Sequence, residues 1–103
     1  MNILKQIFGS MPTADFSDLI KNGATIVDVR SKGEYQSGHI KGSLNIPLDT
    51  LKTNLSRFKK DQVIITCCAS GMRSGSAKGL LEQNGFIKVY NGGGWTSLQQ
   101  KIK

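Results

Sequence analysis

Residues 66–74, with the sequence TCCASGMRS, place two adjacent cysteines at the end of an apolar run, and an arginine follows shortly after. A cysteine thiolate is a strong nucleophile, and a nearby cation stabilises it. Counted from Cys67, Arg73 closes a C-x5-R loop; counted from Cys68, it closes a shorter C-x4-R loop. The longer loop would be wide enough for a tetrahedral phosphate. The shorter loop suits one additional sulfur atom on the cysteine.

The segment between the cysteines and the arginine is small or flexible and carries no charge: Ala69, Ser70, Gly71 and Met72. Gly71 permits positive φ, so successive N–H groups can point toward one centre. A helix predicted to begin near Arg73 and Ser74 directs its positive end to the same centre. We therefore expect an anion-binding loop that lowers the pKa of a solvent-accessible thiol. The alternative is an ordinary strand–helix turn with an exposed arginine.

Alternating strands and helices are predicted around this loop. Segments rich in β-branched and apolar residues indicate strands at 25–29, 43–47, 63–67 and 86–90. Helical spacing of apolar residues, with Ser31 and Glu34 as a capping box, indicates helices near 16–20, 31–38, 48–58, 74–84 and 95–102. The glycines of 91–94 indicate a tight turn. This alternation predicts an α/β fold with a mainly parallel sheet covered on both faces, and ligand sites in such folds lie at the carboxyl ends of the strands.

The chain has 103 residues, which is enough for one domain. Residues 1–12 are interpreted as an N-terminal segment whose short apolar helix packs on the domain formed by residues 13–103. No apolar run reaches the length of a membrane span, and the first residues do not have the pattern of a secretory signal. We therefore expect a cytoplasmic protein that does not bind membranes, and we expect a monomer.

The formal net charge is +7, but the lysines are spread along the chain and form no basic block interleaved with aromatic residues. This distribution argues against nucleic-acid binding. It suits a small anionic substrate, because a positive surface raises the local concentration of anions.

Three stretches of the sequence resemble the rhodanese sulfurtransferase family. The loop CASGMRS (68–74) is similar to the family's active-site loop, with glycine three positions and arginine five positions after the cysteine. IVDVRSKGEYQSGHIKGSLNIP (26–47) and LLEQNGFIKVYNGGGW (80–95) resemble its N-terminal and C-terminal signatures. The resemblance covers about residues 13–103. It implies a three-layer α/β/α rhodanese-like fold with a central sheet of about five strands, and it selects Cys68 as the catalytic cysteine.

The resemblance implies a thiosulfate sulfurtransferase that works through a persulfide on Cys68. The substrate-binding residues would be those of the loop: Ala69, Ser70, Gly71, Met72, Arg73 and Ser74. A small anionic donor such as thiosulfate would load Cys68, and a thiophilic acceptor such as cyanide, a small thiol or a protein thiol would unload it, with ping-pong kinetics. No cofactor is implied. Because the loop has no basic residue before Arg73, the preference for a particular donor stays open.

Asp28, Arg30 and Glu34 are predicted to support the site rather than to take part in the chemistry. A buried carboxylate at Asp28 needs a cation, and Arg30 and Arg73 are the two candidates. His39 is expected to be a packed, hydrogen-bonded side chain. A single histidine and the absence of ligand-type cysteine spacing argue against a metal site.

Two other functions remain open from the sequence. One is a phosphatase-like enzyme that uses Cys67, although Thr66 and Ser70 stand where that signature has histidine and glycine. The other is a non-catalytic sulfur-carrier or protein-docking module on the same fold. Because side chains alternate along a strand, Cys67 should face away from Cys68, in the core or beside the site.

Overall fold

The computed structural model of the chain describes residues 15–102. The helix expected within residues 1–12 lies outside the described residues. In the described part, no helix is both long enough and apolar enough to cross a membrane.

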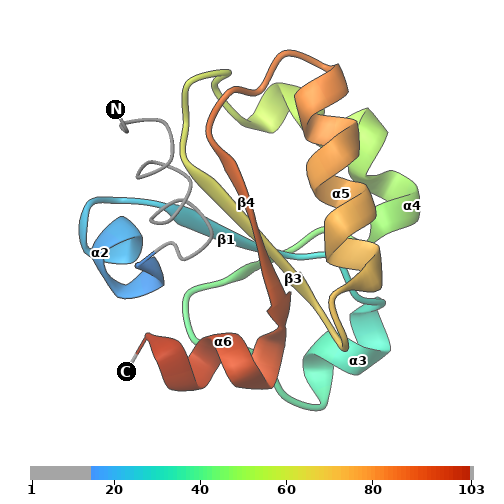
Figure 1. Ribbon diagram of the computed structural model, residues 1–103. Helices are drawn as coiled ribbons and strands as arrows, with labels where there is room; N and C mark the ends of the chain where they lie inside the picture. The colour runs from blue at the N-terminus through green and yellow to red at the C-terminus, as the bar shows by residue number, and fades with distance from the viewer. Residues whose placement is uncertain (1–14, 103) are drawn as a thin grey trace.

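A parallel sheet forms the centre of the domain (Figure 1). Its strands follow the order β2-β1-β3-β4, and each neighbouring pair is parallel. The strand bounds are β1 (Thr25–Asp28), β2 (Leu44–Asn45), β3 (Ile64–Cys68) and β4 (Val89–Gly94). The predicted α/β class is confirmed. The sheet has four strands within residues 15–102, where about five were expected, because only four extended segments of this part pair and the segments between them are helices or loops.

Helices cover both faces of this sheet. Figure 1 shows α4 and α5 on one side and α2 and α6 on the other, with α3 near the carboxyl ends of the strands. The bounds are α2 (Phe16–Lys21), α3 (Lys32–Gln36), α4 (Leu48–Leu51), the 3-10 helix η1 (Lys52–Arg57), α5 (Met72–Gln83) and α6 (Trp95–Lys101). The segment expected as one helix over 48–58 is therefore a single α-helical turn continued by 3-10 turns.

Two apolar clusters, one on each face of the sheet, form the core. The cluster under α4 and α5 contains Val27, Val29, Leu51, Ile64, Cys68, Leu81 and Phe86 among its buried members. The cluster under α2 and α6 contains Ile26, Ile40, Ile65, Cys67 and Leu98. Side chains alternate between the two faces along each central strand. The two cysteines consequently lie on opposite faces, as the sequence predicted.

The last strand differs from the prediction. A strand was expected at 86–90 and a tight turn at 91–94, whereas β4 begins at Val89 and continues through Gly94. Residues 86–88 instead connect α5 to β4, and the Phe86 N–H donates to the Leu81 carbonyl in the last turn of α5. The glycines then continue the strand because a side chain would not fit: a Cβ at Gly92 would lie 2.8 Å from Leu98 and 2.9 Å from the Thr66 carbonyl oxygen.

Local signals in the sequence were more reliable. The Ser31–Glu34 capping box is present at the start of α3. Gly85, expected just beyond α5, has a φ of +92°. The start of α5 falls one to two residues earlier than predicted, at Met72, with Gly71 as its N-cap at a φ of +107°. This earlier start brings the first amides of α5 to the end of β3.

Candidate active site

Cys68 is the last residue of β3 and lies below the first turn of α5. Its sulfur accepts hydrogen bonds from two backbone amides, those of Gly71 at 3.0 Å and Ser74 at 3.3 Å. The positive φ of Gly71 turns the chain so that both N–H groups face the sulfur. The loop thus gathers donors around one sulfur atom, in the arrangement that a C-x4-R register requires.

The side chain of Ser74 is a further neighbour of this sulfur. Ser74 is fully buried, and its Oγ lies 3.5 Å from Cys68 Sγ. The same hydroxyl contacts Asn91 Oδ1 at 2.6 Å. Asn91 was not among the predicted site residues. The sequence indicated only a turn at 91–94, and the contact with Ser74 depends on the pairing of β4 with β3.

The surroundings of Cys68 favour its thiolate. Burial alone would raise the pKa of this thiol, but hydrogen bonding with the Ser74 side chain and hydrogen bonds from the amides of Ser74, Gly71 and Ser70 lower it below its ordinary value. The start of α5 adds the positive end of a twelve-residue helix. The reactive, deprotonated form of Cys68 is therefore stabilised.

One expectation about this thiol is wrong. The sequence analysis expected a thiol open to solvent, whereas Cys68 is only 1% exposed. The cause is its position as the last strand residue, where its side chain points into the core under α5. The loop residues above it are exposed instead, and Met72 reaches 80% exposure.

Cys67 has a different environment. Its side chain is buried on the opposite face of the sheet. Burial, with a smaller contribution from the negative charge of Asp28, raises the pKa of Cys67 to about 12. This thiol stays protonated at physiological pH and belongs to the core. The geometry gives no support to a phosphatase centred on Cys67.

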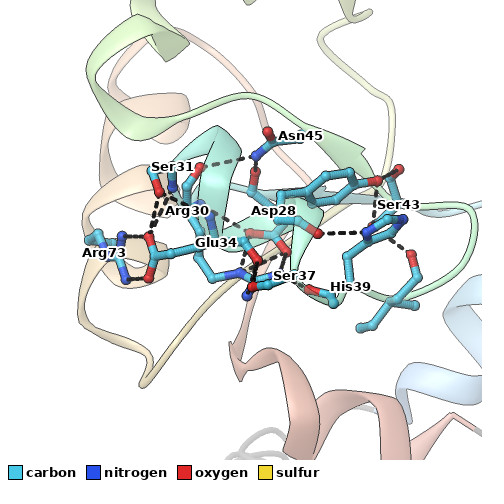
Figure 2. A network of polar contacts seen from close by, with 12 residues as sticks. Asp28, Arg30, Ser31, Glu34, Ser37, His39, Ser43, Asn45 and Arg73 are labelled. Carbon is cyan, nitrogen blue, oxygen red and sulfur yellow. Dashed lines mark hydrogen bonds and ion pairs between the residues drawn. The ribbon is translucent and has the colours of Figure 1, made fainter.

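Arg73 forms a bidentate ion pair with Glu34 (Figure 2). Its Nη1 and Nη2 donate to the two carboxylate oxygens at 2.7 and 3.0 Å. This hydrogen-bonded pairing, together with the capping-box amide of Ser31, lowers the pKa of Glu34 to about 2. The pair ties the start of α5 to α3. Both side chains are more than one third exposed, at 39% for Arg73 and 38% for Glu34, so an anion can still approach the guanidinium.

Asp28 forms a buried ion pair, as the sequence predicted. Of the two candidate cations, Arg30 and Arg73, the partner is Arg30. Arg30 Nη2 lies 2.8 Å from Asp28 Oδ2, and the same nitrogen donates to the Gly38 carbonyl at 2.7 Å. The guanidinium also stacks over the Trp95 ring, 4.7 Å from its centroid. Figure 2 shows this pair within the network that joins α3 to the segment before β2. Neither side chain has a hydrogen bond to Cys68, and their supporting role stays a prediction.

His39 is hydrogen-bonded, as expected, but it lies on the surface and not in a packed interior. Its ring stacks on Tyr35 with 3.7 Å between centroids, and its Nδ1 lies 2.8 Å from the Tyr35 carbonyl oxygen. Within residues 15–102, no three His, Cys, Asp or Glu side chains gather in a way that could hold a metal ion.

A cavity of about 350 Å³ opens beside Arg73. Its lining residues come from the loop between β1 and α3, the start of α4 and the start of α5: Val29, Ser31, Pro47, Leu48, Asp49 and Arg73. Val29 also belongs to the apolar cluster that contains Cys68. The cavity therefore adjoins the sulfur's side of the sheet and presents a guanidinium.

With this geometry in view, the chain belongs to the Rhodanese-like domain family, whose model matches residues 12–101. Among curated proteins, it is 38% identical over 81 residues to the uncharacterized protein YqhL of Bacillus subtilis and spans 64% of that protein. It is 36% identical over 70 residues to the thiosulfate sulfurtransferase PspE of Escherichia coli. That alignment covers 66% of this chain and 67% of PspE.

Solved structures agree with this family. The human single-domain sulfurtransferase TSTD1 superimposes with a TM-score of 0.77 at 25% identity, over 90% of this chain and 94% of TSTD1. A rhodanese from E. coli, solved with anions, gives a TM-score of 0.68 at 33% identity, over 72% of this chain and 89% of that one. The resemblance stated from the sequence motifs is thus confirmed at the level of family and fold.

Proposed function

We propose that this chain is a sulfurtransferase that carries a sulfane sulfur as a persulfide on Cys68. The single observation that carries the proposal is the pair of hydrogen bonds from the Gly71 and Ser74 amides to Cys68 Sγ. Amides directed at a sulfur stabilise negative charge on it without a metal or a cofactor. That charge lies on Sγ in the attacking thiolate and passes to the outer sulfur when the persulfide forms, next to the same loop.

The reaction proceeds in two halves. In the first, the Cys68 thiolate attacks the outer sulfur of a donor such as thiosulfate, the donor's S–S bond breaks, and sulfite leaves with the bonding electron pair. In the second, a thiophilic acceptor such as cyanide, a small thiol or a protein thiol attacks the outer sulfur of the persulfide. The Cys68 thiolate is then released unchanged. Covalent catalysis of this kind gives ping-pong kinetics.

Arg73 is the residue best placed to attract the donor. Its guanidinium lines the cavity beside the site and remains partly exposed while paired with Glu34. The remaining loop residues, Ala69, Ser70 and Met72, are exposed and uncharged. Because Cys68 is almost fully buried, a donor reaches its sulfur only when these residues shift.

Sulfur loading tests this function directly. After incubation with thiosulfate, intact mass spectrometry should show the addition of one sulfur atom, and cyanide should remove it as thiocyanate. The Cys68→Ser variant should take up no sulfur. Cys67→Ser is the matched control because its thiol is buried on the other face and stays protonated; it should keep most of the loading. Uptake by Cys68→Ser, or its loss in Cys67→Ser alone, would contradict the assignment.

The burial of Cys68 favours a second candidate, a non-catalytic carrier or docking module of the same fold. A carrier would receive its sulfur from a partner protein and would turn over slowly with small donors. Measuring loading and cyanide turnover separately distinguishes the two functions. Turnover indicates an enzyme, and sulfur loading without turnover indicates a carrier. If thiosulfate, a persulfide donor and polysulfide all fail to load the protein, the result indicates a docking module.

A further inference from the structure

The hydroxyl of Ser74 has one proton and three possible acceptors. Its Oγ lies 2.6 Å from Asn91 Oδ1, 3.1 Å from the Gly71 carbonyl oxygen and 3.5 Å from Cys68 Sγ. The contact with Asn91 is the shortest. A hydroxyl can donate only one hydrogen bond at a time, so the three acceptors compete.

Two neighbouring bonds determine the orientation of the Asn91 amide. The Gly93 N–H donates to Asn91 Oδ1 at 2.9 Å, which requires an oxygen at that position. On the other side, Asn91 Nδ2 donates to the Gly71 carbonyl at 3.4 Å. The atom that faces Ser74 is therefore an acceptor. It follows that the Ser74 hydroxyl donates its proton to Asn91 in the arrangement observed.

With its proton directed to Asn91, Ser74 Oγ turns a lone pair toward Cys68. That arrangement suits a protonated Cys68, whose S–H can donate to Ser74 Oγ. It does not suit a thiolate, because two acceptors would then face each other in a buried site. When the thiol proton leaves to solvent, the Ser74 hydroxyl must rotate and give up its bond to Asn91 in order to donate to the sulfur.

We propose that Asn91 is a positioning residue that holds the Ser74 hydroxyl in its resting orientation and competes with the Cys68 sulfur for that one hydrogen bond. The inference rests on the proposed function only in taking Cys68 as the reactive group. Asn91 has no hydrogen bond to the sulfur. Its short contact with Ser74, at 2.6 Å, is the route by which it acts, since its bond to the Gly71 carbonyl is much longer at 3.4 Å. Through this contact, the end of β4 sets how readily Cys68 becomes a nucleophile.

The experiment titrates Cys68 in a two-by-two set of variants. The ultraviolet absorbance of the thiolate reports the pKa of Cys68, and Cys67 stays silent because its pKa is about 12. Asn91→Ala removes the competing acceptor, so the pKa of Cys68 should fall by about half a unit to one unit, the scale of the one neutral hydrogen bond to Asn91 that the hydroxyl no longer has to give up. In the Ser74→Ala background, Asn91→Ala should leave the pKa unchanged, because the hydroxyl that links the two residues is gone.

A second substitution controls for the possibility that Asn91→Ala disturbs the backbone, because alanine also removes the oxygen that accepts the Gly93 N–H. Asn91→Asp keeps an oxygen for Gly93 and for Ser74 but holds the hydroxyl more strongly, so it should raise the pKa of Cys68. The rise should be larger with Ser74 present than in the Ser74→Ala background, where only the added charge acts. Equal shifts in both backgrounds, for either substitution, would show that Asn91 does not act through Ser74 and would overturn the inference.

These titrations need no sulfur donor. If thiosulfate fails to load the protein while the pKa values follow the pattern above, the proposed function fails and the role of Asn91 stands. If loading succeeds while the shifts are equal in both backgrounds, the role of Asn91 fails and the proposed function stands.

Discussion

The two arginines near the site form ion pairs in opposite surroundings. Arg30 and Asp28 are buried, and further contacts with a carbonyl and an aromatic ring satisfy the guanidinium. Breaking such a pair from one side leaves a buried charge, which is strongly destabilising. Arg73 and Glu34 are partly exposed, so water and salt weaken their attraction. The first pair supports the fold, and the second can respond to an anion.

We expect a pH-dependent contribution of Glu34 to stability. Its folded pKa of about 2 lies below the ordinary 4.5, so the contribution is present above about pH 4.5 and is lost as the pH falls through about 2. Glu34→Gln should lower the Tm at neutral pH by no more than a few degrees, since the pair is exposed. Thermal melts of both proteins should converge as the pH approaches 2.

The matched control is Glu82→Gln, which breaks the exposed i,i+4 pair of Glu82 with Lys78. This pair lies within α5, beyond the loop, so Glu82→Gln should leave sulfur loading unchanged. Glu34→Gln, in contrast, should alter the dependence of sulfur loading on donor concentration. A difference between wild type and Glu34→Gln that stays constant down to pH 2 would refute the ion-pair account.

At the level of elements, the site is a strand, a turn and a helix in direct succession. β3 ends on Cys68, Gly71 reverses the chain, and α5 begins at Met72. The turn needs glycine for its backbone conformation: a Cβ at Gly71 would be no closer than 3.5 Å to its neighbour, but the φ of +107° is strained for any other residue. The sulfur's amide donors depend on that single conformation.

Gly71→Ala should therefore reduce both stability and reactivity. We expect a loss of about 1–2 kcal/mol in the free energy of unfolding, from the strain of a left-handed alanine, together with a higher pKa of Cys68. Urea denaturation and thiolate titration measure the two effects.

Gly79→Ala is the control within the same helix. Gly79 lies in α5 with open space around it and needs no special conformation. Its replacement should stabilise the protein by about 0.5–1 kcal/mol and leave the pKa of Cys68 unchanged. A Gly71→Ala protein as stable as wild type, with an unaltered thiol, would show that the turn does not hold the donors.

At the scale of the whole molecule, a small domain supports a buried thiol and a buried ion pair with two modest apolar clusters. Domains of this size are stable by only about 5–15 kcal/mol. Each large core side chain consequently accounts for an appreciable share of that stability. Phe86, 2% exposed, packs edge-to-face on Phe58. It lies just before the start of β4, and therefore at the end of the parallel sheet opposite to the loop that follows β3.

Phe86→Ala should lower the free energy of unfolding by about 3–5 kcal/mol, through lost burial and the cavity left behind. Its neighbour Ile87 is 72% exposed, so Ile87→Ala should change stability by less than about 0.5 kcal/mol. Urea denaturation of the pair provides the comparison. If both variants lost a similar amount of free energy of unfolding, Phe86 would not be a core residue and the assignment of the core to these two clusters would be wrong.

Much of the fold could be predicted from local patterns. Segments rich in β-branched and apolar residues located three strands and the start of the fourth, the capping box at Ser31 marked the start of α3, and the glycine at 85 marked the end of α5. These features depend on residues close together in the chain. The glycine-rich segment 91–94 misled the prediction, because its place in β4 depends on close packing against Ile65, Thr66 and Leu98.

For the candidate site, the sequence by itself determined the residue types and their spacing: two adjacent cysteines near the end of a strand, the arginine that follows them, and the glycine that allows the chain to turn. The predicted strand ended at Cys67, whereas β3 ends at Cys68, and it was the family resemblance that selected Cys68. Local order is enough for these, since β3, the loop and the start of α5 are contiguous. Only the tertiary structure decided that Arg30, rather than Arg73, neutralises Asp28, that Cys68 lies buried beneath its loop, and that Asn91 reaches Ser74. All three findings depend on which strands lie side by side and on how closely α5 packs on them. The spacing of residues along the chain encodes neither the strand order nor this packing.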